Sequence, residues 1–308
     1  MRPELSIIIV NYNVRDLLKN CISSIYRFHS VDAVEIIVVD NASTDDSRQI
    51  ITSEFPKVIW IGNDHNAGFS DANNQGIEAA TGEQILLLNP DTELKEDAIH
   101  LMLSKLKTVP DSDMVVPCLL NTDSTLQKSC WKFPGLMNII LEAFYLHLLF
   151  RKSEYDTSNY ANDFSPQAAS GAALMFHKAL YRKIGGLDPD LFWMEDTDFG
   201  YRIFRNGGKI HFLSSAHIYH HSGKSSAKNL HVAIANQLIS KIKYFRKHFS
   251  SAYFVIASLF IFIQIITRSI AFSLLSLFGS SFSAKRKAYF FSLQKFWSFL
   301  ILKESKIR

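Results

Sequence analysis

Cysteine is scarce in this chain of 308 residues, and several common cofactor-binding motifs are missing. The three cysteines, Cys21, Cys118 and Cys130, are too few for a disulfide framework and do not have zinc-site spacing. We therefore expect free thiols in a reducing cytosol. We also expect no signal peptide, because the apolar run at residues 5–10 is short and no cleavage site follows it. These absences argue against a secreted disulfide-rich protein and against a structural zinc module.

Glycine-rich nucleotide loops are lacking as well. No Gly-x-Gly-x-x-Gly follows the first expected strand and no complete P-loop occurs, which disfavours a nicotinamide enzyme and a P-loop NTPase. Negative charge is almost missing from the C-terminal part: after residue 240 there are twelve Lys and Arg and one acid, Glu304. The 240 residues before it carry 21 basic and 28 acidic residues. An acidic body with a basic end argues against nucleic-acid binding and predicts contact with an anionic surface such as a membrane.

The sequence does contain a regular alternation of strand and helix patterns. Short apolar runs rich in β-branched residues, typical of buried parallel strands, alternate with stretches of helical apolar spacing. The expected strands are residues 5–10, 35–39, 57–61 and 84–88, and the expected helices lie near 14–26, 44–55, 71–80 and 95–107. This alternation predicts an α/β fold with a mostly parallel sheet flanked by helices.

The pattern weakens in the middle of the chain. Between residues 118 and 167 the clearest feature is an apolar helical stretch at 138–150, and this region could form a lid on the acceptor side. Order returns with a strand at 170–176, whose small residues allow close backbone approach, and with a helix at 196–206. We expect the α/β domain to occupy residues 1–245.

Residues 246–308 have the composition of a hydrophobic helical tail that associates with a membrane. Residues 249–267 carry no charge and are long enough to cross a hydrocarbon core; Arg268 then interrupts, and a second apolar run reaches Phe282. Both flanks are basic, so the positive-inside rule places both on the cytoplasmic face. A re-entrant hairpin, two crossings or helices lying in the interface all fit, and a buried pair of soluble helices is the alternative.

Polar residues follow the expected strands and turns at a few positions. These are Asp40, Asp91, the pair Glu195-Asp196, and His220. Ligands of open α/β sheets bind at the carboxyl ends of the strands, so we expect these side chains in one crevice. A crevice lined by carboxylates accepts an anionic substrate only with a divalent cation between them. The pattern therefore indicates chemistry on a nucleotide diphosphate.

Seven short motifs occur in a fixed order along the chain. They are Val10-Asn11-Tyr12-Asn13, Val39-Asp40-Asn41-Ala42-Ser43-Thr44-Asp45, Asn66-Ala67-Gly68-Phe69, Asn73-Asn74-Gln75-Gly76, Leu88-Asn89-Pro90-Asp91, Trp193-Met194-Glu195-Asp196-Thr197-Asp198 and His220-His221-Ser222-Gly223. In this order they resemble the family-two inverting glycosyltransferases, and among these the rhamnosyltransferase-like branch of bacterial surface polysaccharide synthesis. The similarity covers roughly residues 5–250 and implies a GT-A-type fold.

The resemblance also implies a binding role for many matched residues. The implied contacts to the donor nucleotide are Val10, Tyr12, Asp40, Asn41, Asn66, Asn74 and Asn89. Asp91 and His220 are the implied ligands of a divalent cation, Mg²⁺ or Mn²⁺. The family usually has a second aspartate where this chain has Asn89, so one formal charge is missing.

The resemblance places the acid–base chemistry at the start of the late helix. Asp196 matches the general base that deprotonates the acceptor hydroxyl, and Trp193 and Glu195 would border the acceptor sugar. We expect the adjacent carboxylates to raise the pKa of one another, which suits a base near neutral pH.

Each of these residues also has an ordinary structural explanation. Asp40 ahead of Ser43 or Thr44 is typical of a helix N-cap. Asn-Pro-Asp readily forms a β-turn, two acids at a helix start complement the helix dipole, and a lone histidine is more often structural than a ligand.

The expected function is transfer of a sugar, with inversion, from dTDP-rhamnose to a hydroxyl of a lipid-linked saccharide in O-antigen-like polysaccharide synthesis. The expected location is the cytoplasmic face of the plasma membrane, peripheral or re-entrant. The main alternative is a catalytically silent, membrane-bound scaffold that binds nucleotide sugar, which loss of Asp91 or Asp196 would have favoured. A nucleotidyltransferase would need a loop rich in glycine and arginine after the first strand, and residues 11–14 are not one.

Overall fold

The computed structural model of the protein describes residues 3–30, 33–111, 113–148, 157–221, 230–276 and 279–302. The chain packs as two compact units. The first consists of Met1–Lys132, Tyr155–Pro189 and Glu195–Ser222, and the second of Phe133–Glu154, Asp190–Met194 and Gly223–Arg308. A functional boundary at residue 245 stays a prediction.

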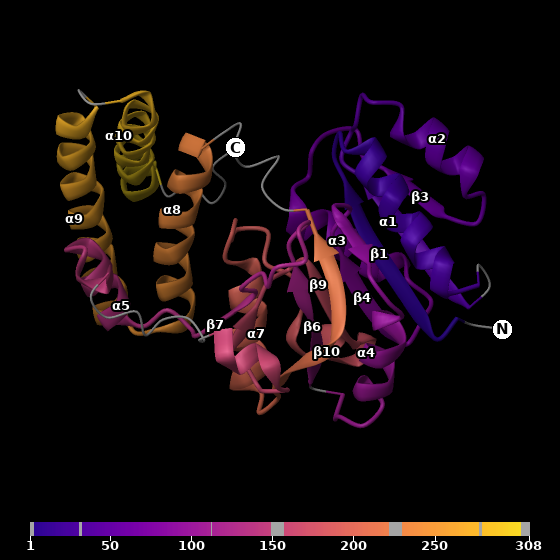
Figure 1. Ribbon diagram of the computed structural model, residues 1–308. Helices are drawn as coiled ribbons and strands as arrows, with labels where there is room; N and C mark the ends of the chain where they lie inside the picture. The colour runs from indigo at the N-terminus through magenta and orange to yellow at the C-terminus, as the bar shows by residue number, and fades with distance from the viewer. Residues whose placement is uncertain are drawn as a thin grey trace. The chain divides into compact units, whose positions relative to one another are not determined.

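The first unit is an alternation of strands and helices (Figure 1). Its elements are β1 (Leu5–Asn11), α1 (Arg15–Phe28), β2 (Val34–Asp40), α2 (Ser47–Glu54), β3 (Ile59–Gly62), α3 (Phe69–Ala79), β4 (Gln84–Leu88), β5 (Thr92–Leu94), α4 (Ala98–Leu106), β6 (Met114–Leu120), β7 (Cys130–Trp131), the 3₁₀ helix Thr157–Ala161, β8 (Ala168–Ala169), β9 (Ala173–His177), α6 (Lys178–Ile184), α7 (Glu195–Arg205) and β10 (Ile210–His220). The four strands and four helices expected in the first 110 residues are all present, with ends shifted by a few residues.

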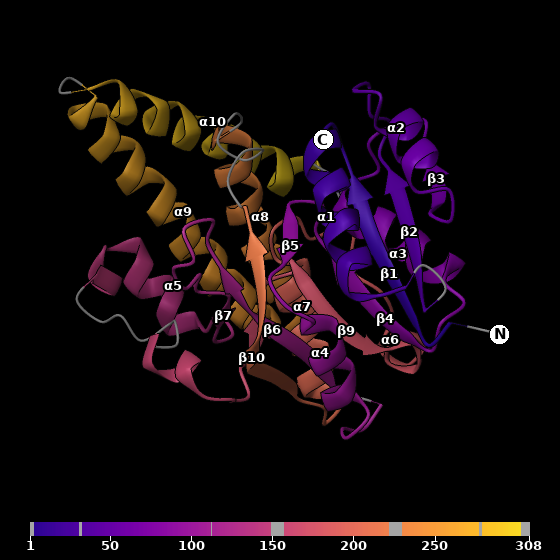
Figure 2. The ribbon, with the colours of Figure 1, turned by 45° about the vertical axis from the view of Figure 1, so that its right-hand side comes forward.

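Eight of these strands form one sheet in the order β3-β2-β1-β4-β9-β6-β10-β5. Strands β1 to β4 pair in parallel, as do β6 and β10, whereas β9 lies antiparallel between β4 and β6 (Figure 2). The expected mostly parallel α/β sheet is therefore confirmed. The β9 insertion brings the segment before Ala173 to the carboxyl end of β4, because an antiparallel strand begins where its neighbour ends.

Alternate residues of the central strands explain why helices cover both faces of the sheet. Ile7 and Ile9 of β1 belong to an apolar cluster with residues of α1 and α4, while Ile8 belongs to a second cluster with residues of α3, α6 and α7. All three side chains are fully buried. Burial of such a side chain contributes about 1.5–3 kcal/mol, so strands that are apolar on both faces specify a three-layer arrangement.

The second unit is helical. It contains α5 (Leu136–Ala143), the 3₁₀ helix Leu146–Leu148, α8 (Leu230–His248), α9 (Ser251–Leu275) and α10 (Ser280–Leu302). Within the described residues, α9 is the one helix with the length and apolarity to cross a membrane. Arg268 of α9 donates to the hydroxyl of Tyr289 at 2.9 Å and to the carbonyl of Glu142 at 3.2 Å, and it lies over the Tyr145 ring. This charge is thus paired with polar and aromatic groups inside the unit.

The contact between α3 and β1 gives a test of the packing. An added Cβ at Gly76 would lie 2.4 Å from Ile8 Cγ2, so Ile8 or α3 must shift in Gly76→Ala. We expect a loss of about 1–3 kcal/mol in the free energy of unfolding, measured by denaturant titration. Gly62→Ala is the matched control, because the nearest atom there, of Trp60, is 3.7 Å away. Equal stability of the two variants would contradict this packing.

Candidate functional site

The carboxyl ends of β1, β2 and β4 bring several polar segments to one edge of the sheet. Asn11 at the end of β1 is level with Asp40 at the end of β2 in the parallel register. The neighbouring strand β4 ends at Leu88, directly before the turn at residues 89–91. This edge is where open α/β sheets bind ligands. That Asp40, Asp91, Asp196 and His220 share one crevice there stays a prediction.

Asp40 organises the turn that follows β2. Its Oδ1 accepts a hydrogen bond of 2.7 Å from Asn11 Nδ2, and its Oδ2 accepts the Ser43 N–H at 3.0 Å. The Asn11 amide also donates to Ser43 Oγ, and Ala42 adopts a left-handed backbone with φ 59°. The helix-cap interpretation of Asp40 is wrong, because α2 begins only at Ser47. Sequence reasoning missed the role of Asn11, although a polar residue that ends an otherwise apolar strand was a usable signal.

Asn41 and Asn66 shape the loop that leads into α3. Asn41 Nδ2 donates to the carbonyl of Gly68 at 3.2 Å, and Asn41 Oδ1 accepts from Asn63 Nδ2 at 2.9 Å. Asn66 Oδ1 accepts the Gly68 N–H at 3.0 Å, and Gly68 has a φ of 90° that favours glycine. These amides hold the loop in place at the sheet edge. Their contacts to a nucleotide stay predictions.

The amide of Asn74 in α3 forms two hydrogen bonds with the backbone of one residue. Asn74 Nδ2 donates to the carbonyl of Leu187 at 2.8 Å, and Asn74 Oδ1 accepts the Leu187 N–H at 2.9 Å. An added Cβ at Gly186 would lie 2.2 Å from Asn74 Oδ1, so the contact requires glycine there. The observed contacts give Asn74 a positioning role, and its contact to the donor nucleotide stays a prediction.

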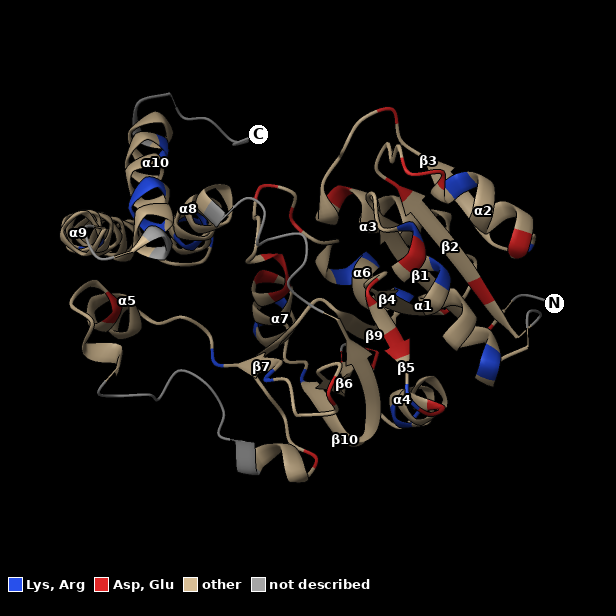
Figure 3. Ribbon diagram, turned by 45° about the horizontal axis from the view of Figure 1, so that its top comes forward, with Lys and Arg blue, Asp and Glu red and all other residues tan. Residues whose placement is uncertain are grey.

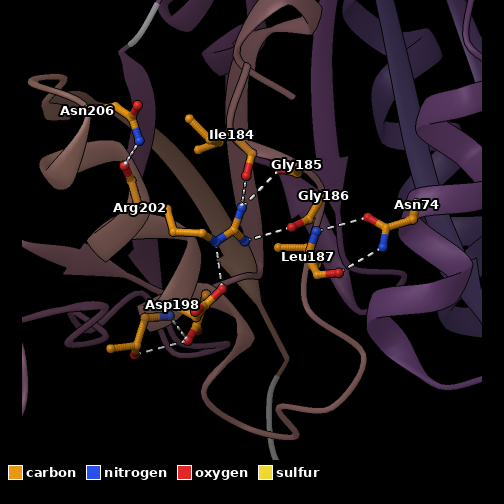
Figure 4. Close-up of polar contacts among 10 residues, drawn as sticks. Asn74, Ile184, Gly185, Gly186, Leu187, Asp198, Arg202 and Asn206 are labelled. Carbon is orange, nitrogen blue, oxygen red and sulfur yellow. Dashed lines mark hydrogen bonds and ion pairs between the residues drawn. The ribbon is translucent and has the colours of Figure 1, made fainter. Parts of the chain in front are cut away.

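Arg202 of α7 holds the other side of the same loop (Figure 4). Its guanidinium donates to the carbonyls of Ile184, Gly185 and Gly186, at 2.7, 3.0 and 2.6 Å, which satisfies the end of α6. Arg202 Nε also donates to Oδ2 of the fully buried Asp198 at 2.8 Å. The loop therefore connects α3 to the helix that carries Asp196.

Asp91 and His220 face each other across an antiparallel strand pair. His220 of β10 lies opposite Thr92 of β5, and Asp91 directly precedes Thr92. Oδ1 of Asp91 is 3.4 Å from His220 Nε2, and the Asp91 carbonyl accepts the His221 N–H at 2.8 Å. The side chains of Asp91 and His220 are only 24% and 11% exposed. The two expected metal ligands are thus adjacent in a partly enclosed position.

This geometry fits a divalent cation. Two ligands each about 2.1 Å from one ion, at about 90–110°, lie roughly 3.0–3.4 Å apart. The described residues contain no cluster of three or more His, Cys, Asp or Glu side chains around a common point. A cation at Asp91 and His220 would therefore take its other ligands from substrate oxygens and water, as Mg²⁺ commonly does.

Asp196 is held by backbone donors at the start of α7. Its Oδ2 accepts the Gly171 N–H at 3.2 Å and its Oδ1 accepts the Thr197 N–H at 2.6 Å. The next residue after Gly171, Ala172, accepts the Asn89 N–H at 2.9 Å through its carbonyl. Consecutive residues before β9 thus contact both the Asp196 carboxylate and the turn that contains Asp91.

Burial raises the pKa of Asp196 to about 6, and the Gly171 and Thr197 N–H donors limit the rise. Loss of hydration is the leading cause, rather than the neighbouring carboxylate that the sequence suggested. A carboxylate with this pKa is ionised at neutral pH and is more basic than an exposed aspartate. It can therefore act as a general base.

The remaining expected site residues are half-buried or exposed. Val10 is half-buried and Tyr12 is 50% exposed at the end of β1. In the second unit, Trp193 is 44% exposed and has a φ of 72°, a left-handed conformation that is rare for a bulky residue. Glu195 is half-buried at the first position of α7. None of the four is tested as a ligand contact.

A family model described as "Glycosyl transferase family 2" matches residues 6–185. An N-acetylglucosaminyl-diphospho-decaprenol L-rhamnosyltransferase of Mycobacterium tuberculosis is 23% identical over 247 residues, which are 74% of this chain and 80% of the relative. A low-salt glycan biosynthesis hexosyltransferase of Haloferax volcanii is 27% identical over 228 residues, 70% of this chain and 68% of the relative.

Solved structures show the same fold. A mannosyltransferase from Pyrobaculum calidifontis, in complex with GDP-mannose and Mn²⁺, has a TM-score of 0.60 at 17% identity. The similarity covers 99% of this chain and 89% of the mannosyltransferase chain. A GalNAc-T7 structure with UDP, GalNAc and Mn²⁺ also has a TM-score of 0.60, at 15% identity. The similarity covers 96% of this chain and 56% of the GalNAc-T7 chain. The expected GT-A fold is confirmed.

The raised pKa of Asp196 predicts how Asp196→Asn changes stability with pH. The native pKa of about 6 exceeds the ordinary value of 3.8, so wild-type stability falls as pH rises between these values and stays reduced above them. Asparagine does not titrate. As pH rises from about 4 to about 7, the free energy of unfolding of the variant should therefore increase by about 1–2 kcal/mol relative to that of wild type. This figure allows for solvent screening of a half-buried group.

Melting temperatures of both proteins, measured across this range, check the prediction. A constant offset from the altered hydrogen bond to Gly171 or Thr197 does not affect it, because only the change with pH is compared. Parallel curves for the two proteins would contradict the raised pKa.

Proposed function

This chain belongs to glycosyl transferase family 2, and we propose that it transfers rhamnose from dTDP-rhamnose, with inversion, to a hydroxyl of a lipid-linked saccharide. Sugar transfer from a nucleotide donor in surface polysaccharide synthesis follows from the family and its relatives. The single observation that carries the proposed inverting chemistry is the contact of Gly171 with Asp196 next to the contact of Ala172 with Asn89. This arrangement supports a base and a diphosphate site on either side of one sugar carbon.

In the proposed reaction, Asp196 takes the proton of the acceptor hydroxyl while the oxygen of that hydroxyl attacks the anomeric carbon. The Gly171 and Thr197 N–H groups hold the two carboxylate oxygens, so the base is oriented before the substrate arrives. Attack from the face opposite the departing diphosphate inverts the anomeric carbon. Trp193 and Glu195 would contact the acceptor sugar, one by stacking and the other by hydrogen bonding.

Asp91 and His220 would hold the divalent cation, Mg²⁺ or Mn²⁺, beside the donor diphosphate. When bound, such an ion supplies Lewis-acid neutralisation of the leaving diphosphate. An imidazole ligand shifts the preference toward Mn²⁺. Asn89, on the same turn, would offer a neutral oxygen to the donor.

Donor recognition falls to the ends of β1 and β2. Val10 and Tyr12 would pack on the base, and Asp40 and Asn41 would hydrogen-bond the base and ribose. Asn66 and Asn74 would act on the donor through the loops that they hold. The Mycobacterium tuberculosis relative is named for L-rhamnosyl transfer onto a decaprenol-linked sugar, which supports rhamnose and a lipid-linked acceptor here.

The helical unit supports a location at the cytoplasmic face of the membrane. Large apolar side chains are exposed along α9 and α10: Tyr253, Val255, Leu259, Ile270, Leu274, Phe290 and Trp297. Lysines and arginines of α8 and α10 accompany them (Figure 3). Apolar side chains beside positive charge favour an anionic lipid surface, where a lipid-linked acceptor would also reside.

Asp196→Asn should lower kcat by about 10²–10⁴-fold, because the acceptor hydroxyl then has no base. The donor should still raise the melting temperature of the variant as it does for wild type, since donor contacts are unchanged. Glu195→Gln is the matched control: its kcat should stay within about threefold while the acceptor KM rises. Turnover of Asp196→Asn close to wild type would remove Asp196 as the base.

Replacing exposed apolar residues of α9 should weaken membrane binding. In the double variant Val255→Asn and Leu274→Asn, side chains that are 60% and 64% exposed become polar without disturbing packed groups. We expect a severalfold drop in flotation with vesicles that contain anionic lipid. Ile59→Asn, at a position 43% exposed in β3, is the control and should float like wild type. Unchanged flotation of the double variant would contradict the role of α9.

A further inference from the structure

A turn between β6 and β7 contacts the end of β10 at three consecutive side chains. Ser124 Oγ is 3.0 Å from the Tyr219 hydroxyl, and Thr122 Oγ1 is 3.0 Å from His221 Nδ1. Between them, Gln127 Oε1 lies 2.7 Å from His220 Nδ1. The middle contact reaches the ring of a proposed metal ligand on the side away from Asp91.

The hydrogen bonds behind Gln127 fix which way its amide points. Gln127 Nε2 donates to Asn121 Oδ1 at 3.0 Å, and Asn121 Nδ2 donates to Thr125 Oγ1 at 2.9 Å. The Thr125 hydroxyl in turn donates to Asp123 Oδ1 at 2.6 Å, and this bond is the leading cause of a lowered pKa of Asp123. An ionised carboxylate can only accept hydrogen bonds, so Asp123 sets the donor and acceptor of each hydrogen bond from Thr125 to Gln127.

That direction determines the tautomer of His220. Because Gln127 presents its oxygen, Nδ1 of His220 must carry the hydrogen. In the neutral ring Nε2 then has a lone pair directed toward the Asp91 carboxylate 3.4 Å away. Two electron-rich groups at this distance, both largely enclosed, repel unless a proton or a metal cation lies between them.

We infer that Gln127 is a positioning residue that fixes His220 as the Nδ1–H tautomer and so aims Nε2 at a divalent cation shared with Asp91. Metal-bound histidines generally donate their second ring N–H to such an acceptor, and the acceptor sets ring orientation and ligand basicity. Asn121, Thr125 and Asp123 act through Gln127 by setting its polarity. The inference rests on the proposed cation site, but the tautomer can be measured without metal.

The test uses the full-length protein with histidine labelled by ¹⁵N and with no metal added. At about pH 8.5, wild-type His220 should give the ¹⁵N shifts of a single Nδ1–H tautomer. Gln127→Met keeps the side-chain length but removes the acceptor, and its His220 shifts should move toward a mixture of tautomers. Thr122→Ala is the matched control, because it removes a neighbouring contact of the same turn to His221 and should leave His220 unchanged.

The second readout is Mn²⁺ affinity, followed by the electron paramagnetic resonance signal of free Mn²⁺ in the presence of dTDP. Gln127→Met should weaken binding about 10–100-fold, and Thr122→Ala should stay within about twofold of wild type. Wild-type His220 as the Nε2–H tautomer, or a Gln127→Met variant with wild-type tautomer and affinity, overturns the inference. If wild type binds no Mn²⁺ while Gln127 still controls the tautomer, the cation site itself is wrong, and with it the proposed metal chemistry.

Discussion

The peptide pair Gly171–Ala172 is the contact on which the rest of the site depends. Gly171 donates to the Asp196 carboxylate, and Ala172 accepts the N–H of Asn89 from the turn that carries Asp91. The proposed base and the turn of the proposed diphosphate site therefore contact consecutive residues of one short segment. Because β9 pairs antiparallel with β4, this segment arrives at the carboxyl end of the parallel strands, where the donor-side residues also lie.

Several polar side chains of α3 and α7 form hydrogen bonds with backbone groups. The amide of Asn74 forms two hydrogen bonds with Leu187, and the Arg202 guanidinium donates to three carbonyls and to Asp198. Buried or half-buried polar groups of this kind destabilise the fold unless they have hydrogen-bond partners. When all partners are present, the hydrogen bonds restrict the loop after α6 to one conformation. These internal hydrogen bonds surround a small number of proposed reactive groups, chiefly Asp196, Asp91 and His220.

The sequence predicted the parallel half of the fold well, and the site in part. Apolar runs such as residues 35–39 and 84–88 are buried on both faces, and that pattern alone specifies β2 and β4. The position of β9 was not predictable, because antiparallel insertion depends on pairing across more than 80 residues and leaves no local pattern. The burial that raises the pKa of Asp196 comes from tertiary packing, so the sequence could suggest only the adjacent acid as a cause. Gln127 lies in a region of weak periodicity, and its contact with His220 depends on the tertiary fold that brings the turn after β6 to the end of β10.

The central claim is that a fixed carboxylate and a diphosphate site act on opposite faces of one anomeric carbon. The most direct test is the anomeric configuration of the transferred sugar, read from the carbon–proton coupling constant of the product by nuclear magnetic resonance. The expected product has a configuration opposite to that of the sugar in the nucleotide donor. A product with the configuration of the donor would contradict it, because retention requires a different placement of the reacting groups.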